Sequence, residues 1–205
     1  RALSESVEFN QDAFVSFQVY PDALNFMETQ YHINLSALAN NSWETSNIGA
    51  FEMGLYKDYY LSNNGLSSLP TNNQLISSLA NVFAYENDFQ ACFLINMDKE
   101  VAGTNCGSLY MLLDQEIHTA PLSAGAKDSI LRKKMNEAIE KDSSYALKTV
   151  SISPFSLQKA DALCILNISD GVIPVTKYRK KAYQGEGFAS FMRQLLLKMT
   201  QDSLV

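Results

Sequence analysis

Residues 89–104 read FQACFLINMDKEVAGT, and this stretch decides the predicted fold. Residues 89–97 are rich in aromatic and branched side chains, which is typical of a buried strand. Asp98 and Lys99 are predicted to form a tight turn, after which residues 100–104 return as a second strand. The stretch is therefore predicted to be a β-hairpin.

The segments after this hairpin are predicted to be three strands and three helices. The strands are expected over residues 145–153, 161–168 and 172–176, the last two joined by the turn Ser169-Asp170-Gly171. The helices are expected over residues 110–113, 128–141 and 187–203, with Asp128 as the N-cap of the second. The first is short, and a loop is expected to follow it as far as Pro121.

The first 85 residues are predicted to be mostly helix and loop. Apolar side chains recur there at spacings of three and four residues, which favours amphipathic helices. The four helices are expected over residues 3–17, 24–38, 48–61 and 75–82.

The element order predicts an α+β fold of the PAS type. A hairpin, a helical crossover and three further strands would form one five-stranded antiparallel sheet with a helical cover. The predicted domains are a helical stalk and cover (residues 1–85), a PAS-like core (residues 86–182) and a C-terminal signal helix (residues 183–205).

Composition excludes several classes of protein. The chain has 205 residues with 16 Lys and Arg against 22 Asp and Glu, a net charge of −6 that argues against a nucleic-acid partner. No segment is apolar over the length that a membrane span needs. The two histidines, His32 and His118, lie far apart without a ligand pattern, so neither a metal nor a cofactor is expected.

Residues 94–104, LINMDKEVAGT, resemble the first hairpin of Cache or PDC domains, the PAS-like sensors of bacterial receptors. The match departs at Lys99, where those domains usually have glycine, and at Asn96, where they often have aspartate. The resemblance implies a non-enzymatic, periplasmic sensor that binds an unknown small molecule. It also implies a homodimeric parent receptor, attached to the membrane only by spans outside this chain.

The last four residues, Asp202-Ser203-Leu204-Val205, are similar to the entry of diguanylate cyclase domains. That similarity implies a cytoplasmic location as the alternative, with the sensor joined directly to its output domain. Because the chain begins at Arg1 inside an expected helix, we interpret it as a fragment of a longer protein.

Six residues are candidates for binding the ligand. They combine aromatic and charged side chains beside apolar segments, a pattern typical of small-molecule pockets. They are Tyr110, Asp114, Lys148, Asp161, Tyr178 and Arg179. If the strand continues through Tyr178 and Arg179, only one of that pair can face the pocket. If residues 177–181 do not bind a ligand, this basic run is predicted to be a solvent-exposed strand end.

The terminal helix carries an apolar seam at Phe188, Met192, Leu195 and Met199, spaced four, three and four residues. This spacing is heptad-like and favours a dimerising signal helix. A helix packed on its own domain is the alternative, because less than two heptads cannot form a coiled coil alone.

The three cysteines, Cys92, Cys106 and Cys164, allow either one disulfide with one thiol or three thiols. Cys106-Gly107-Ser108 superficially matches a cysteine-protease nucleophile, but the supporting residues are absent, so an enzyme using Cys106 is a minor alternative.

The chain is predicted to be a ligand-sensing input domain. Ligand binding would change its conformation, and the terminal helix would transmit this change to an output domain. A protein-interaction or assembly domain without a small-molecule ligand is the main alternative.

Overall fold

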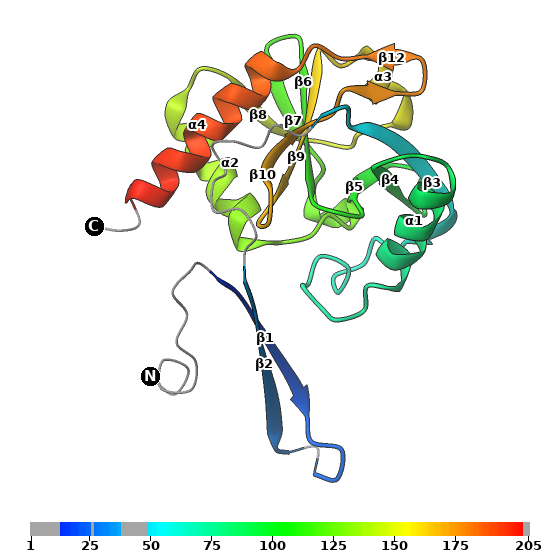
Figure 1. The fold of residues 1–205 in the computed structure, drawn as a ribbon, viewed down its shortest axis with the longest axis vertical. Coiled ribbons are helices and arrows are strands. Elements are labelled where there is room, and N and C mark those ends of the chain that lie inside the picture. Colours follow the sequence, from blue (N-terminus) through cyan, green and yellow to red (C-terminus); the bar gives the residue numbers. More distant parts are fainter. Residues whose placement is uncertain (1–12, 26, 38–48, 203–205) are drawn as a thin grey trace. The chain divides into compact units, whose positions relative to one another are not determined.

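A computed structural model describes residues 13–25, 27–37 and 49–202 of the chain. The chain separates into two compact units, Arg1–Ser42 and Trp43–Val205. The described part of the first unit is one β-hairpin, whereas the second unit contains the remaining strands and all of the described helices (Figure 1).

The hairpin of the first unit pairs β1 (Ala13–Pro21) with β2 (Thr29–Ala37) in antiparallel register. The rings of Phe17 and Tyr31 stack across it with centroids 5.8 Å apart. At its turn, the carboxylate of Asp22 accepts hydrogen bonds from the backbone amides of Leu24 and Asn25, which lower the pKa of Asp22. Side-chain and backbone contacts therefore both hold the hairpin.

The helices predicted over residues 3–17 and 24–38 are wrong wherever the structure describes them. Residues 13–17 belong to β1, and β2 begins at Thr29 after a turn. Residues 3–12, 26 and 38 lie outside the described residues. The error comes from the apolar spacing: Val15, Phe17 and Val19 alternate with polar residues, which is the period of a strand.

The second unit contains two five-stranded sheets. In the first sheet the order is β12-β11-β3-β4-β5. Strand β3 runs parallel to both β11 and β4, and the remaining pairs are antiparallel. The bounds are β3 (Glu52–Leu61), β4 (Ala91–Asn96), β5 (Val101–Thr104), β11 (Lys177–Tyr178) and β12 (Lys181–Ala182).

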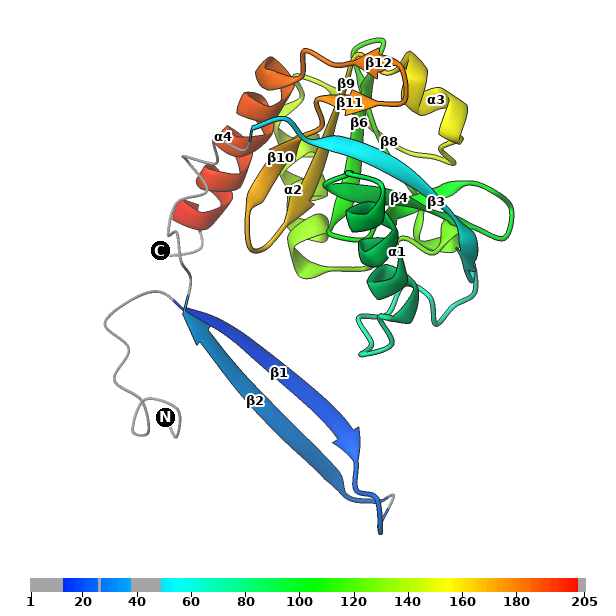
Figure 2. The same cartoon turned by 45° about the vertical axis from the view of Figure 1, so that its right-hand side comes forward.

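Helix α1 (Leu75–Glu86) covers the outer face of this sheet (Figure 2). Its buried residues Ala80 and Ala84 are small, so the helix backbone can approach the strands closely. The rings of Tyr56 on β3 and Phe83 on α1 meet edge to face, with centroids 5.6 Å apart. A small apolar cluster therefore joins α1 to β3 and β4.

The second sheet has the order β10-β9-β6-β7-β8, with β7 parallel to β8 and the other pairs antiparallel. Its bounds are β6 (Ser108–Leu113), β7 (Glu116–Thr119), β8 (Ala146–Thr149), β9 (Ala162–Asn167) and β10 (Gly171–Pro174).

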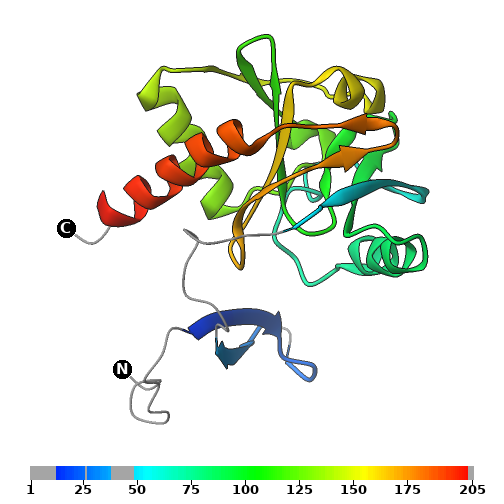
Figure 3. The same cartoon turned by 45° about the horizontal axis from the view of Figure 1, so that its top comes forward.

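Helices α2 (Ile130–Asp142) and α4 (Glu186–Asp202) pack on the outer face of the second sheet, away from α1 (Figure 3). The short segment η1 (Leu122–Ala124) lies between β7 and α2, and α3 (Pro154–Lys159) lies between β8 and β9. The second unit is therefore layered as helix, sheet, sheet and paired helices.

The main core of the second unit lies between the two sheets. Phe93 of β4 and Tyr178 of β11 meet edge to face there, with centroids 5.1 Å apart. Met111 of β6 and Ile165 of β9 enter the same core from the second sheet. Burial of these large side chains holds the two sheets together.

The hairpin predicted over residues 89–104 is confirmed as β4 and β5. Asn96 is fully buried at its turn, where its Oδ1 accepts hydrogen bonds from the amides of Asp98 (3.0 Å) and Glu100 (2.9 Å). Its Nδ2 donates to the carbonyl of Ala124 at 3.0 Å. Lys99 takes the left-handed conformation, with φ +62°, that the turn requires.

Other element predictions divide into two groups. Helices α1, α2 and α4 and strands β8, β9 and β10 are confirmed in type, although Ser129 and not Asp128 is the N-cap of α2. The helices predicted over residues 48–61 and 110–113 are wrong where the structure describes them, because the first segment contains β3 and the second lies in β6. Residue 48 lies outside the described residues. Both strands are rich in tyrosine and other large apolar residues, which pack well within sheets.

The predicted PAS-like fold, one antiparallel sheet with a helical cover, is also wrong. The ten described strands of the second unit form two mixed sheets, because β3 pairs in parallel with β4 and β11 in the first sheet and β7 pairs in parallel with β8 in the second. Among the described residues, no helix is both long and apolar enough to span a membrane.

Candidate functional site

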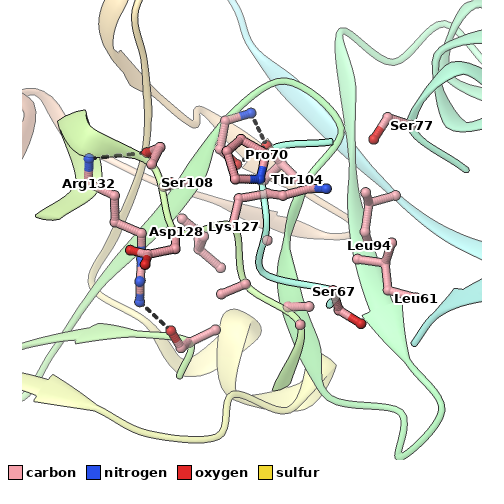
Figure 4. Close-up of a pocket in the computed structure, with 18 of the residues that line it drawn as sticks. Leu61, Ser67, Pro70, Ser77, Leu94, Thr104, Ser108, Lys127, Asp128 and Arg132 are labelled. Carbon is pink, nitrogen blue, oxygen red and sulfur yellow. Dashed lines mark hydrogen bonds between the residues drawn. The ribbon is translucent and has the colours of Figure 1, made fainter. Parts of the chain in front are cut away.

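A pocket of about 900 Å³ opens in the second unit, a volume suited to a small molecule (Figure 4). Four segments that are distant in sequence line it, together with Leu94 of β4. The segments lie within residues 61–77, 102–109, 119–132 and 166–168. Two of its walls differ in chemistry: the α2 wall (residues 125–132) and the strand wall (residues 102–109).

Backbone contacts hold the α2 wall against the loop that follows β3. The amide of Asp128 donates to the carbonyl of Ser68 at 2.8 Å. Gly125 has φ +93°, and a Cβ at this position would lie 2.8 Å from the carbonyl oxygen of Ser62. Only glycine fits this conformation and this close approach. The contacts of Asp128 with Ser68 and of Gly125 with Ser62 therefore hold the α2 wall against the loop after β3.

The α2 wall presents the first turn of helix α2 to the pocket. Ser129 caps the helix, because its Oγ accepts a hydrogen bond from the amide of Arg132 at 3.2 Å. The amides of Ile130 and Leu131 precede the hydrogen-bonded part of the helix, and both residues line the pocket. The positive end of the helix dipole therefore lies in this wall.

Three charged residues line the pocket, all of them in the α2 wall. Arg132 is only 5% exposed, and its Nη2 donates to the carbonyl of Ala120 at 2.5 Å, so its guanidinium is part of the wall itself. Lys127 is half-buried and makes no hydrogen bond or ion pair with any residue that the structure describes. The side chains of Lys127 and the exposed Asp128 extend to different sides (Figure 4).

The strand wall is small and neutral. Thr104 Oγ1 donates to the carbonyl of Gly107 at 2.8 Å and accepts from its amide at 2.9 Å. Asn105 Oδ1 accepts from the amide of Cys92 at 2.8 Å. Between residues 102 and 109, no charged side chain lines the pocket, so this wall offers only hydroxyl, amide and backbone groups.

None of the six ligand-binding candidates lines this pocket. Tyr110 is fully buried on the α2 side of β6, where its hydroxyl donates to Asn136 Oδ1 at 2.7 Å, and burial raises the pKa of Tyr110. The amide of Asp114 donates to Asp161 Oδ2 at 3.1 Å, which brings these two candidates together.

The remaining candidates lie elsewhere in the second unit. Lys148 forms an exposed ion pair with Glu116 at 3.7 Å. Tyr178 is buried between the sheets, and the guanidinium of Arg179 lies 5.3 Å from its ring centroid. A ligand-binding role for the six residues stays a prediction that no contact in the structure supports.

The apolar seam of the terminal helix packs inside the second unit. Phe188, Met192 and Leu195 are at most 5% exposed, and Met199 packs partly buried against the same cluster. The seam therefore contributes to the core on the outer face of the second sheet. A homodimer stays a prediction with no residue of this helix assigned to it.

All three cysteines are free thiols. Burial raises the pKa of Cys92, Cys106 and Cys164, to about 12 for Cys92, whereas a cysteine nucleophile needs a lowered pKa. Cys106 contacts the hydroxyl of Thr104 at 3.5 Å, and His118 contacts Glu116 instead. A nucleophilic role for Cys106 is therefore disfavoured. No cluster of three potential metal ligands occurs among the described residues.

The sequence interpretation missed the charged residues of the pocket. A usable signal was present in residues 125–132, GAKDSILR, where a glycine precedes a serine N-cap at the start of a helix. Asp128 was chosen as the cap, and the next residue, Ser129, has that role.

The family model for class IV aminotransferases matches residues 16–178, more than half of the chain. The chain therefore belongs to the class IV aminotransferase family. Comparison with curated proteins gives no match.

Solved structures confirm the fold at low sequence identity. A protein described as a 4-amino-4-deoxychorismate lyase from Legionella pneumophila has TM-score 0.78 and 14% identity, covering 91% of this chain and 70% of its own. An aminotransferase from Brucella abortus bound to PLP has TM-score 0.78 and 13% identity, with coverages of 96% and 73%. A branched-chain aminotransferase from Thermoproteus uzoniensis with norvaline has TM-score 0.77 and 18% identity, with coverages of 99% and 72%.

These findings overturn the sensor interpretation. The chain is not a Cache or PAS-type domain, so the predicted sensor function, periplasmic location and diguanylate cyclase output are wrong. The non-enzymatic alternatives also fail, because the family is one of enzymes. The resemblance misled because it depended on one hairpin, a motif that many folds share.

The fold implies pyridoxal 5′-phosphate (PLP), which two of the similar structures contain. PLP enzymes provide a lysine for its carbonyl and a charged partner, usually Asp or Arg, for its ring nitrogen. Among the residues that the structure describes, Lys127 is the only lysine in the pocket lining, and the guanidinium of Arg132 is engaged with Ala120. Asp128 is exposed and diverges from Lys127, and the strand wall has no charge. The residues present therefore do not fit the complete set that PLP requires.

Proposed function

We propose that this protein performs amine–carbonyl chemistry on a small anionic substrate, with Lys127 as the amine. The observation that carries this proposal is the position of Lys127, the only lysine that lines the pocket of a chain belonging to an enzyme family. A lysine ammonium that has lost a proton to solvent can attack a carbonyl carbon as the neutral amine, forming a C–N bond with loss of water to give an imine.

The charge of the α2 wall supports an anionic substrate. The ammonium of Lys127 makes no ion pair with any described residue, and the first turn of α2 lies in the same wall. Helix N-termini favour carboxylate and phosphate groups because their amides and dipole both attract negative charge. A carboxylate beside the reacting carbonyl would therefore be held near the amine.

The test is covalent trapping with pyruvate as a simple 2-oxo acid. Borohydride reduces an imine to a stable amine, so a labelled lysine can be located by peptide mass spectrometry. We expect the label on Lys127 of the full chain, and its loss in Lys127→Ala. Lys133→Ala is the control, because Lys133 is an exposed residue on the outer side of the same helix.

The result that contradicts the proposal is equal labelling of Lys127 and Lys133, or labelling unchanged in Lys127→Ala. Such a result would show that pyruvate reacts with exposed amines in general. Circular dichroism of each variant confirms that the fold is retained before labelling is compared.

A further inference from the structure

Three glycines line the pocket, and two of them have a structural reason to be glycine. A Cβ on Gly107 would lie 2.5 Å from the carbonyl oxygen of Leu166, which is closer than real atoms approach. Gly125 has a positive φ and lies against Ser62. Their packing or conformation therefore excludes a side chain at both positions.

At Gly103, in β5, neither close packing nor a positive φ requires a glycine. Its φ lies outside the left-handed region, and a Cβ there would meet only the carbonyl oxygen of Gly107, at 3.7 Å, an ordinary contact. The residue is half-buried and lines the pocket. The backbone and the packing would therefore accept a side chain at this place in the strand wall.

The space at Gly103 adjoins neutral groups. Thr104 uses its hydroxyl to close the turn with Gly107, and the hydroxyl of Ser108 makes no hydrogen bond with any described residue. A ring nitrogen placed against this wall would meet hydroxyl and backbone groups and no charge. The lysine of the pocket lies on the other wall, in the loop before α2.

We propose that this chain does not retain PLP as a resident cofactor, because the strand wall at Gly103 lacks the charged partner that the ring nitrogen requires. This goes beyond imine formation at Lys127, since it concerns a different contact in the pocket. The ligand of the pocket is then a small molecule that hydrogen-bonds to hydroxyl groups on the strand wall and places its anionic group at the α2 wall.

The test is retention of PLP by the purified full chain after dialysis against buffer without PLP. The PLP that remains is measured by its absorbance after denaturation, and affinity is measured separately by titration. We expect the wild-type chain to lose nearly all of its PLP. Gly103→Asp and Gly103→Glu are expected to bind PLP at least about tenfold more tightly, the effect of one charged hydrogen bond.

Gly187→Glu is the matched control, because Gly187 lies in helix α4 with nothing within 4 Å of its Cβ position. It adds the same charge away from the pocket lining and should bind PLP as the wild type does. Gly103→Ala tests whether a side chain alone changes binding, and no gain is expected from it.

Stoichiometric PLP on the dialysed wild-type chain would overturn the proposal. Folded Gly103→Asp and Gly103→Glu chains that bind PLP no better than the wild type would overturn it as well. If neither acidic variant folds, the wild-type measurement decides alone. Pyruvate trapping at Lys127 is a separate readout, so failure of imine formation and retention of PLP are distinguishable.

Discussion

The two walls of the pocket differ in whether the residues that face the ligand also stabilise the fold. In the α2 wall, residues that could act on a ligand also hold the fold: Arg132 anchors Ala120, and Ser129 caps the helix. In the strand wall the structural tasks fall on backbone and small side chains, and Gly103 has no such task. Substitutions of Arg132 and Ser129 in the α2 wall should therefore reduce stability, whereas the strand wall should tolerate an added side chain at Gly103.

The largest expected effect is the loss of the buried guanidinium. Arg132→Ala leaves the carbonyl of Ala120 without its charged donor and opens space in the wall. We expect the free energy of unfolding to fall by about 3 kcal/mol, measured by urea denaturation. Lys133→Ala, at the exposed neighbour, should change it by less than about 0.5 kcal/mol. Equal effects of the two substitutions would contradict the structural role of Arg132.

The second effect compares two glycines of the strand wall. Gly107→Ala places a Cβ 2.5 Å from the carbonyl oxygen of Leu166 and should lower the free energy of unfolding by about 2 kcal/mol. Gly103→Ala meets no such contact and should raise it slightly, by about 0.5 kcal/mol, because alanine restricts the unfolded chain. Thermal unfolding of both variants measures the difference. A similar loss at both positions would refute the freedom assigned to Gly103.

The third effect concerns the helix cap in the α2 wall. Ser129→Ala removes the acceptor of the Arg132 amide, and we expect a loss of about 1 kcal/mol in the free energy of unfolding. Ser123→Ala, at an exposed position in η1, is the matched control with no expected change. Hydrogen exchange should speed up at the first turn of α2 in the first variant alone. Unchanged exchange there would show that the cap contributes nothing.

The last effect is absent at neutral pH, because it is a loss of stability that appears only at alkaline pH. Burial raises the pKa of Cys92, whose amide bonds to Asn105 of the strand wall, from 9.0 to about 12. The folded chain therefore holds this proton longer than the unfolded chain. Its contribution is fully present below pH 9.0 and is lost as the pH rises toward about 12.

Urea denaturation at increasing pH measures this loss. Cys92→Ala should show a shallower decline than the wild type, because the titrating thiol is absent. An identical decline in both chains would assign the effect to other groups, such as Cys106 and Cys164, whose pKa values burial also raises.

The sequence predicted elements well where local signals agreed. The β4–β5 hairpin has branched residues on both sides of a turn, and α2 has a clear apolar stripe that includes Met135 and Ile139. The predictions were wrong where the spacing of apolar residues fitted both the period of a helix and that of a strand. In β3, tyrosines at positions 56, 59 and 60 have helix-like spacing, but Tyr56 packs against α1 from a strand.

The pocket could not be predicted because its lining comes from four separate segments and Leu94 of β4. Lys127 and Gly103 are 24 positions apart in the chain, and nothing local to either residue indicates the other. The six candidates chosen for their charge or aromatic character instead occupy cores, turns and edges. Charge beside an apolar segment does not by itself identify a pocket, since an exposed rim has the same pattern.

By itself, the sequence determined the local structure of the strongly patterned segments, because turn chemistry and side-chain periodicity act over a few residues. Only the tertiary structure decided that β3 pairs with both β4 and β11, and that Lys127 and Gly103 line the same pocket. Such contacts arise from burial between distant segments, and burial depends on the whole fold.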